Sequence, residues 1–133
     1  MGSQLFMPPA VLKKQKAFFS SHNMNINYFD MIVRIWHGRT KTTDAGLYRQ
    51  FVIDTGIKDY TSTKGNLGAQ IWQRQEGDIT HIWTISWWID LESIRAFAGE
   101  EIERARYYDE DKNYLLEFEP TVIHCEAFNF ESL

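Results

Sequence analysis

The sequence has one cysteine and no long hydrophobic run, and each shortage argues against a class of protein. A single cysteine, Cys125, cannot form an internal disulfide, so a reducing compartment is expected. No run approaches the roughly 18 apolar residues of a membrane helix. The first residues also lack the apolar stretch, about 7–15 residues long, of a secretory signal peptide. We therefore expect a cytoplasmic protein with no membrane partner.

Positive charge is also scarce. The chain carries 14 basic and 18 acidic residues, a formal net charge of −4, with a pI of about 5.5. This balance argues against a nucleic-acid-binding surface. Neither a G-x-x-x-x-G-K nor a G-x-G-x-x-G phosphate loop is present, so nucleotide and flavin binding have no support in the sequence and no cofactor is expected.

What is present is the material for one aromatic-rich domain. The 133 residues fit a single domain, and five Trp and nine Phe provide large side chains for its core. Charge sets residues 1–30 apart, because they have a net charge of +2 whereas the rest of the chain has −6. We predict that residues 1–30 are a loosely ordered or appended N-terminal extension and that 31–133 form the domain. A partner-binding arm or a targeting segment is the alternative for the extension.

Hydrophobic periodicity predicts four strands and two helical regions. In chain order, the expected elements are a strand Met31–His37, a helix from Thr42 to a left-handed stop at Gly56, a hairpin of Leu67–Glu76 and Ile79–Trp88 turning at Gly77–Asp78, a helix capped by Asp90 and continuing past Gly99 to Arg106, and a strand Thr121–Phe130. This β-α-β-β-α-β order predicts an α+β, ferredoxin-like domain with an antiparallel sheet and its helices on one face.

The strand Ile79–Trp88 predicts how the sheet is covered. Large apolar side chains occupy both of its faces, with Trp83 and Trp87 on one side and Ile82 and Trp88 on the other. A strand that is apolar on both faces must be covered on both. Because the helices cover only one face, the sequence predicts that a homodimer covers the other.

The chain resembles the antibiotic-biosynthesis-monooxygenase family over about residues 31–128. The resemblance rests on short motifs in a matching order: MIVRIWHG at 31–38, KGN at 64–66, the GD turn at 77–78, SWW at 86–88, ESIRAFAG at 92–99 and ARYY at 105–108. It implies a dimeric α+β barrel, in which two sheets pack face to face and each subunit has a ligand pocket between its sheet and its helices.

The resemblance also implies an activity. Some members of the family oxidise aromatic polyketides or quinols with O₂ and without metal or flavin, and the deprotonated substrate itself reduces O₂. We therefore expect a small cofactor-independent monooxygenase that acts on a phenolic or quinol-type aromatic molecule. The alternative is a non-catalytic ligand-binding or stress-response protein on the same scaffold. Haem degradation is not expected, because residues 91–113 contain no histidine and Arg106 stands where those relatives have their iron ligand.

His37 is the candidate general base, because it ends the first strand beside Gly38, and a neutral imidazole can abstract a phenolic proton near pH 7. The other candidates are expected to line the ligand pocket. They are Asn66 before the second strand, Ser86 and the strand-end tryptophan of the family, Trp88, on one face of the third strand, and Tyr107 and Tyr108 at the pocket rim.

Three further expectations concern polar residues within strands. The predicted strand order brings His37, His81 and His124 toward one end of the sheet, but they lack short-range ligand spacing and no metal site is expected. Arg34, among apolar residues, is expected to pair with a carboxylate across the dimer, the alternative being an anionic substrate. Cys125 is expected to be a small buried core residue.

Overall fold

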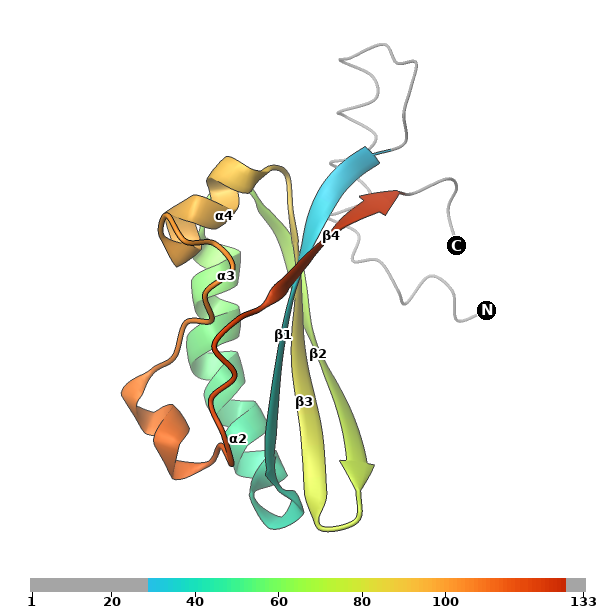
Figure 1. Cartoon of the computed structure of the whole chain (residues 1–133), viewed down its shortest axis with the longest axis vertical. Helices are drawn as coiled ribbons and strands as arrows, with labels where there is room; N and C mark the ends of the chain where they lie inside the picture. The colour runs from blue at the N-terminus through green and yellow to red at the C-terminus, as the bar shows by residue number, and fades with distance from the viewer. Residues whose placement is uncertain (1–28, 129–133) are drawn as a thin grey trace.

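Four antiparallel strands form one sheet, and the helices cover a single face of it (Figure 1). The computed structural model describes residues 29–128. The strands are β1 Phe29–Lys41, β2 Asn66–Glu76, β3 Ile79–Trp88 and β4 Ile123–Phe128, in the order β2-β3-β1-β4. The predicted α+β, ferredoxin-like class is confirmed. Residues 1–28 of the predicted extension lie outside the described range.

The helical elements follow the predicted order. They are α2 Ala45–Val52, a π-helical segment Ile53–Ile57, α3 Lys58–Ser62 and α4 Leu91–Ala98, with short 3₁₀ turns at Thr42–Asp44 and Asp109–Asn113. The predicted cap of α4 is present, since the carboxylate of Asp90 accepts a hydrogen bond from the backbone N–H of Ser93 at 2.8 Å. None of the helices in the described part of the chain has the length and apolar character needed to cross a bilayer.

The register of the sheet confirms that β3 is apolar on both faces. Ile82 and Trp88 face the helices and lie in two neighbouring clusters of buried side chains. Trp87 and Ile85 face the other way and pack with Met31 and Leu67 in a third cluster. We call this second side the helix-free face. On it, cross-strand partners such as Val33 of β1 and Trp87 of β3 share one side of the pleat.

The first helical region does not stop at Gly56, so that prediction is wrong. Gly56 does not have a positive φ and lies inside the π-helical segment, and the helix continues through α3 to Ser62. The reason is that buried positions persist beyond the glycine, with Tyr60 of α3 packed against Trp88 and Phe97. The left-handed glycine that follows the helix is Gly65, with φ 93°.

Replacing Gly56 with alanine is therefore expected to stabilise the protein by about 0.4–1 kcal/mol, because alanine restricts the unfolded chain and fits the helical backbone. A Cβ at Gly56 would meet only Val52 Cγ1, at 4.0 Å. Urea denaturation measures the change. Gly77→Ala is the matched control, because its surroundings are equally open but its φ of 62° disfavours alanine, and it should lose stability. A loss at Gly56 similar to that at Gly77 would contradict the continuous helix.

The second helical region ends at Gly99, and the predicted extension to Arg106 is also wrong. Gly99 has φ 90° and turns the chain out of the helix. Residues 103–105 then run beside 120–122, with hydrogen bonds from Ala105 N to Pro120 O at 2.9 Å and from Val122 N to Glu103 O at 2.8 Å. Backbone pairing with a distant segment replaces the helix, and β4 begins only at Ile123. Positions 129–130 of the predicted strand lie outside the described residues.

Cys125 is exposed rather than buried in the core. It lies on β4, the edge strand, and pairs with Val33 on the helix-free face, where its neighbour Ile123 is also exposed. The alternation that puts His124 and Glu126 on the other face is as expected. Edge position, which the local sequence does not reveal, explains the difference.

Candidate functional site

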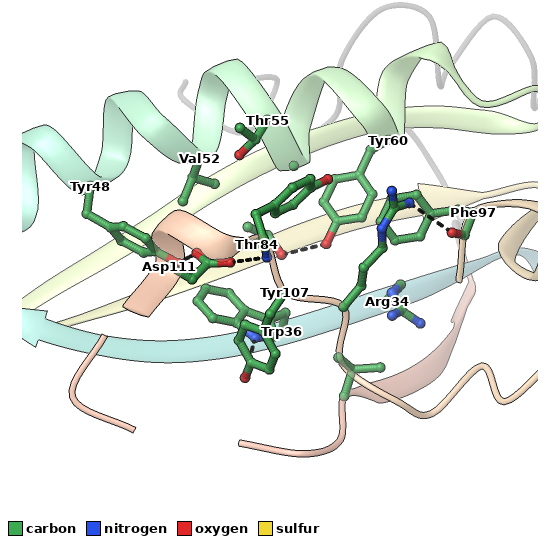
Figure 2. Close-up of a pocket in the computed structure, with 14 residues that line it drawn as sticks. Arg34, Trp36, Tyr48, Val52, Thr55, Tyr60, Thr84, Phe97, Tyr107 and Asp111 are labelled. Atoms are coloured by element: carbon green, nitrogen blue, oxygen red, sulfur yellow. Dashed lines mark hydrogen bonds between the residues drawn. The ribbon is translucent and has the colours of Figure 1, made fainter. Parts of the chain in front are cut away.

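A small cavity lies between the sheet and the helix formed by α2, the π-helical segment and α3 (Figure 2). Its volume is about 40 Å³, room for about three water molecules. Side chains from β1 and from the helix face one another across it, and residues of the segment after α4, which contacts β1, also line it. The site is therefore assembled from parts of the chain that are far apart in sequence.

Six of the fourteen residues that line the cavity are aromatic. Tyr48 and Tyr60 point from the helix toward the sheet (Figure 2), and the Tyr60 and Phe97 ring centroids are 4.7 Å apart. Trp36 meets Tyr107 edge-on, with its indole N–H donating to the Tyr107 hydroxyl at 3.2 Å. Flat apolar walls with a few hydroxyl groups suit a planar ligand.

Arg34 is the most unusual residue at the cavity, because its charged side chain is only 1% exposed. Its Nη1 donates to the carbonyl oxygen of Ile102 at 2.5 Å, and its Nη2 donates to that of Arg104 at 3.1 Å. Among the described residues, no carboxylate lies within 4.0 Å of the guanidinium, and its Nε has no hydrogen-bond partner. Burial lowers the pKa of Arg34.

This placement corrects the expectation that Arg34 pairs with a carboxylate across a dimer. Arg34 points to the helix-covered side of β1, away from the helix-free face. Its partners are neutral groups of its own chain, including the imidazole of His124, whose Nε2 lies 3.1 Å from Nη1. The guanidinium is thus hydrogen-bonded but its charge is not neutralised by a neighbouring carboxylate.

His124 is held in its neutral form by this contact. Since Arg34 can only donate, Nε2 of His124 accepts and the ring proton sits on Nδ1, which is buried without a partner among the described residues. Burial, and then the charge of Arg34, lower the pKa of His124 below its usual 6.5.

The depressed pKa of His124 predicts a pH effect on stability. Between that pKa and 6.5 the unfolded chain binds more protons than the folded chain, so His124 contributes full stability above pH 6.5 and loses it as the pH falls. Urea unfolding from pH 8 to pH 5 should therefore show a steeper loss for the wild type than for His124→Gln, whose amide oxygen can still accept from Arg34. Identical pH profiles would contradict this assignment.

A second set of polar contacts holds Tyr48, Tyr108 and Asp111 in place at the cavity wall. The buried carboxylate of Asp111 accepts from the Tyr48 hydroxyl at 2.7 Å and from the backbone N–H of Tyr108 at 2.6 Å. Burial raises the pKa of Asp111. The Tyr108 hydroxyl donates to Asp59, and burial together with this hydrogen bond raises the pKa of Tyr108. These groups are engaged with one another, which holds Tyr48 and Tyr108 in place.

The residues predicted to line the pocket divide into two groups. Tyr107 and Tyr108 line the cavity. Trp88 and Ser86 are fully buried in the core beside it, with the indole N–H donating to the serine Oγ at 2.8 Å. Asn66 occupies a bulge at the start of β2, where its side-chain oxygen accepts from Gly68 N at 2.9 Å. Neither Asn66, Ser86 nor Trp88 contributes to the cavity lining.

His37 lies on the opposite side of the sheet from the cavity. Its Nδ1 is 2.6 Å from the carboxylate of Glu119, and its Nε2 is 2.8 Å from Nδ1 of His81. His124 is on the helix-covered side, so strand faces separate it from the other two. Within residues 29–128, no group of three His, Cys, Asp or Glu side chains is arranged to hold a metal ion.

The sequence analysis did not identify Tyr60, because it ended the helix at Gly56. The signal was available, because Tyr48, Val52, Gly56 and Tyr60 recur every four residues and all four line the cavity. Because this spacing continues past Gly56, it predicts a helix that extends to Tyr60 and places all four residues on one face. The backbone carbonyl groups that accept hydrogen bonds from Arg34 could not be predicted, because every residue has such a group.

Fold and site together define a ferredoxin-like α+β protein with an aromatic cavity, containing a buried arginine, between its sheet and its helices. No protein-family model and no curated protein matches the chain. A solved structure from Bacillus cereus, named as a candidate antibiotic biosynthesis monooxygenase, covers 78% of this chain and 97% of its own, with 9% sequence identity and a TM-score of 0.46.

Proposed function

We propose that this protein is a small cofactor-independent monooxygenase whose phenolic or quinol-type substrate binds in the aromatic cavity. The observation that carries the proposal is the buried guanidinium of Arg34, which lines this cavity without a carboxylate partner among the described residues. Oxygenation without a cofactor requires an electron-rich substrate anion. A desolvated cation at the cavity wall favours that anion over the neutral phenol.

The chemistry assigns a task to each part of the cavity. The bound phenol loses its proton to solvent, and the phenolate reduces O₂. One oxygen atom enters the ring, and the other leaves as water with the displaced ring hydrogen and one proton taken back from solvent, so phenol and O₂ give a quinone and water. Arg34 stabilises the phenolate, and the rings of Trp36 and Phe97 exclude water from it. His37 takes no part in this reaction, because it faces away from the cavity.

A second candidate function is non-catalytic binding of a small ligand on the same scaffold. The size of the cavity favours it, because about 40 Å³ holds a few waters and a phenol requires the wall to move. The π-helical segment at Thr55 and Gly56 borders the cavity and offers a place for that movement. The two functions differ in turnover, not in the site.

Oxygen uptake tests the proposal. The protein is incubated with a panel of phenols and quinols in an oxygen electrode, alongside Arg34→Met, His37→Ala and a control, Arg49→Met, at an exposed arginine of α2 outside the cavity lining. Uptake matching substrate loss is expected for the wild type, with a loss of about 10²-fold or more for Arg34→Met. His37→Ala and Arg49→Met should keep the wild-type rate.

Two results would contradict the proposal. Ligand binding without oxygen uptake would favour the non-catalytic function. Uptake that is abolished in His37→Ala but kept in Arg34→Met would move the chemistry to the helix-free face. Thermal midpoints of all variants control for misfolding.

We also propose that the protein is a homodimer that pairs through the helix-free face. Trp83 is only half-buried there, and Trp72 and Ile123 are exposed on the same face. Apolar side chains gathered on one sheet face favour packing against a second copy. Light scattering at micromolar concentration should give twice the 15.7 kDa of one chain; the mass of one chain would contradict the dimer.

A further inference from the structure

The Arg34 guanidinium has hydrogen-bonding capacity that its own chain leaves unused. A guanidinium carries five N–H donors. Nη1 makes two contacts, to Ile102 O and His124 Nε2, and Nη2 makes one, to Arg104 O. Nε makes none. The Nε–Nη2 edge, which can grip two oxygen atoms side by side, therefore has a single contact.

The charge of Arg34 also has no carboxylate in direct contact among the described residues. Its nearest neighbours are neutral: Ser86 opposite it on β3, His124 on β4, the Tyr60 hydroxyl of α3, which interacts with the guanidinium, and the Phe97 ring of α4, whose centroid lies 5.5 Å from Cζ. The carboxylate of Glu103 attracts the guanidinium from beyond 4.0 Å, and its effect on the pKa of Arg34 is weaker than that of burial, which lowers it. A buried ion without a partner is costly, by several kcal/mol in typical proteins. A fold that keeps this cation in a cavity wall is suited to a ligand that brings the opposite charge.

The other arginine at the cavity does not share this property. Arg106 is about half-exposed, donates to the carbonyl oxygen of Phe97 at 3.1 Å and lies 3.7 Å from the carboxylate of Asp59. Its guanidinium also lies over the rings of Phe97 and Tyr108. Because Arg106 already has a carboxylate, an incoming anion gains most at Arg34.

We infer that the cavity selects a planar aromatic anion, with a carboxylate or phenolate oxygen bound at the Nε–Nη2 edge of Arg34. The aromatic walls select flatness, and the unpaired guanidinium selects negative charge over an uncharged polar group of the same shape. The location of the ligand rests on the proposed function, but the charge preference does not depend on turnover. The substrate class is thereby narrowed from phenols in general to acidic phenols that bind as anions. An aromatic carboxylate such as benzoate would bind but, without a phenol group, would not be oxidised.

Calorimetric titration at pH 8, where His124 is neutral, tests this inference with benzoate, 4-nitrophenolate and the uncharged isostere benzamide. Wild-type protein should bind benzoate or 4-nitrophenolate at least about 10-fold more tightly than benzamide. Arg34→Met should bind benzoate no better than benzamide, and Arg34→Lys should fall between the two, because lysine keeps the charge but loses the two-pronged edge. Arg49→Met, at an exposed arginine of α2 that does not line the cavity, should behave as wild type.

Equal affinity of the wild type for benzoate and benzamide would overturn the inference. So would an unchanged preference in Arg34→Met, or no binding of either anion at millimolar concentration. Thermal midpoints of the ligand-free variants show that each is folded at the titration temperature, since Arg34→Met leaves the carbonyl oxygens of Ile102 and Arg104 without this donor. Anion preference without oxygen uptake would overturn the proposed function alone, and oxygen uptake without anion preference would overturn the inference alone.

Discussion

Replacing Trp88 with alanine is expected to lower the free energy of unfolding by about 3–5 kcal/mol. Trp88 is 0% exposed and packs against Tyr60 and Phe97 beneath the cavity. The substitution removes the ring that joins α3 and α4 to the sheet. It also leaves the Oγ of Ser86 without its indole donor in a buried site.

The control is Leu47→Ala, because Leu47 lies on α2, away from the helix-free face, and is 67% exposed. We expect a loss of about 1 kcal/mol or less there, measured by urea denaturation of the same preparation. If Trp88 instead formed the pocket wall, as the family resemblance implies, Trp88→Ala would weaken ligand binding while costing little stability. That outcome would contradict its placement in the core.

Replacing Gly65 with alanine should cost about 3 kcal/mol, the sum of a strained backbone and a lost helix cap. Gly65 has φ 93°, and a Cβ there would lie 1.9 Å from Ser93 Oγ and 2.5 Å from Ser93 Cβ. Ser93 must move, yet its hydroxyl and backbone N–H both bond to Asp90 at the start of α4. Two independent features of the fold are therefore lost together.

Two controls separate these causes. Gly77→Ala has a positive φ but open surroundings, so it should show the backbone cost alone, about 1 kcal/mol. Adding Ser93→Gly to Gly65→Ala removes the clash, and the double variant should recover part of the loss relative to the sum of the single variants. Equal costs at Gly65 and Gly77, or strict additivity with Ser93→Gly, would contradict the close approach of Gly65 to α4.

The fold could be predicted from the sequence because its signals are local. Alternation along β3, the Gly77–Asp78 turn and the Asp90 cap each depend on a few neighbouring residues, and together they specify a β-α-β-β-α-β order. Where a local signal was ambiguous, the prediction was wrong. A glycine at position 56 reads as a stop, although the helical spacing of buried residues continues beyond it.

The candidate site could not be predicted to the same extent, because its contacts join distant segments. Arg34 donates hydrogen bonds to the carbonyl groups of Ile102 and Arg104 and to His124. These partners lie about 70 to 90 residues away in the sequence, so no local pattern predicts the contacts. The face that His37 occupies depends on register. In β1, Arg34 and Trp36 point to the helices, and His37, one residue further on, points away.

The role of Arg34 is tested most directly by a crystal structure of the protein with 4-nitrophenolate. The phenolate oxygen is expected within about 3 Å of Nε or Nη2 of Arg34, with the ring between Trp36 and Tyr60. A ligand bound in the cavity with its phenolate oxygen toward solvent, or bound beside His37 on the helix-free face, would contradict that role.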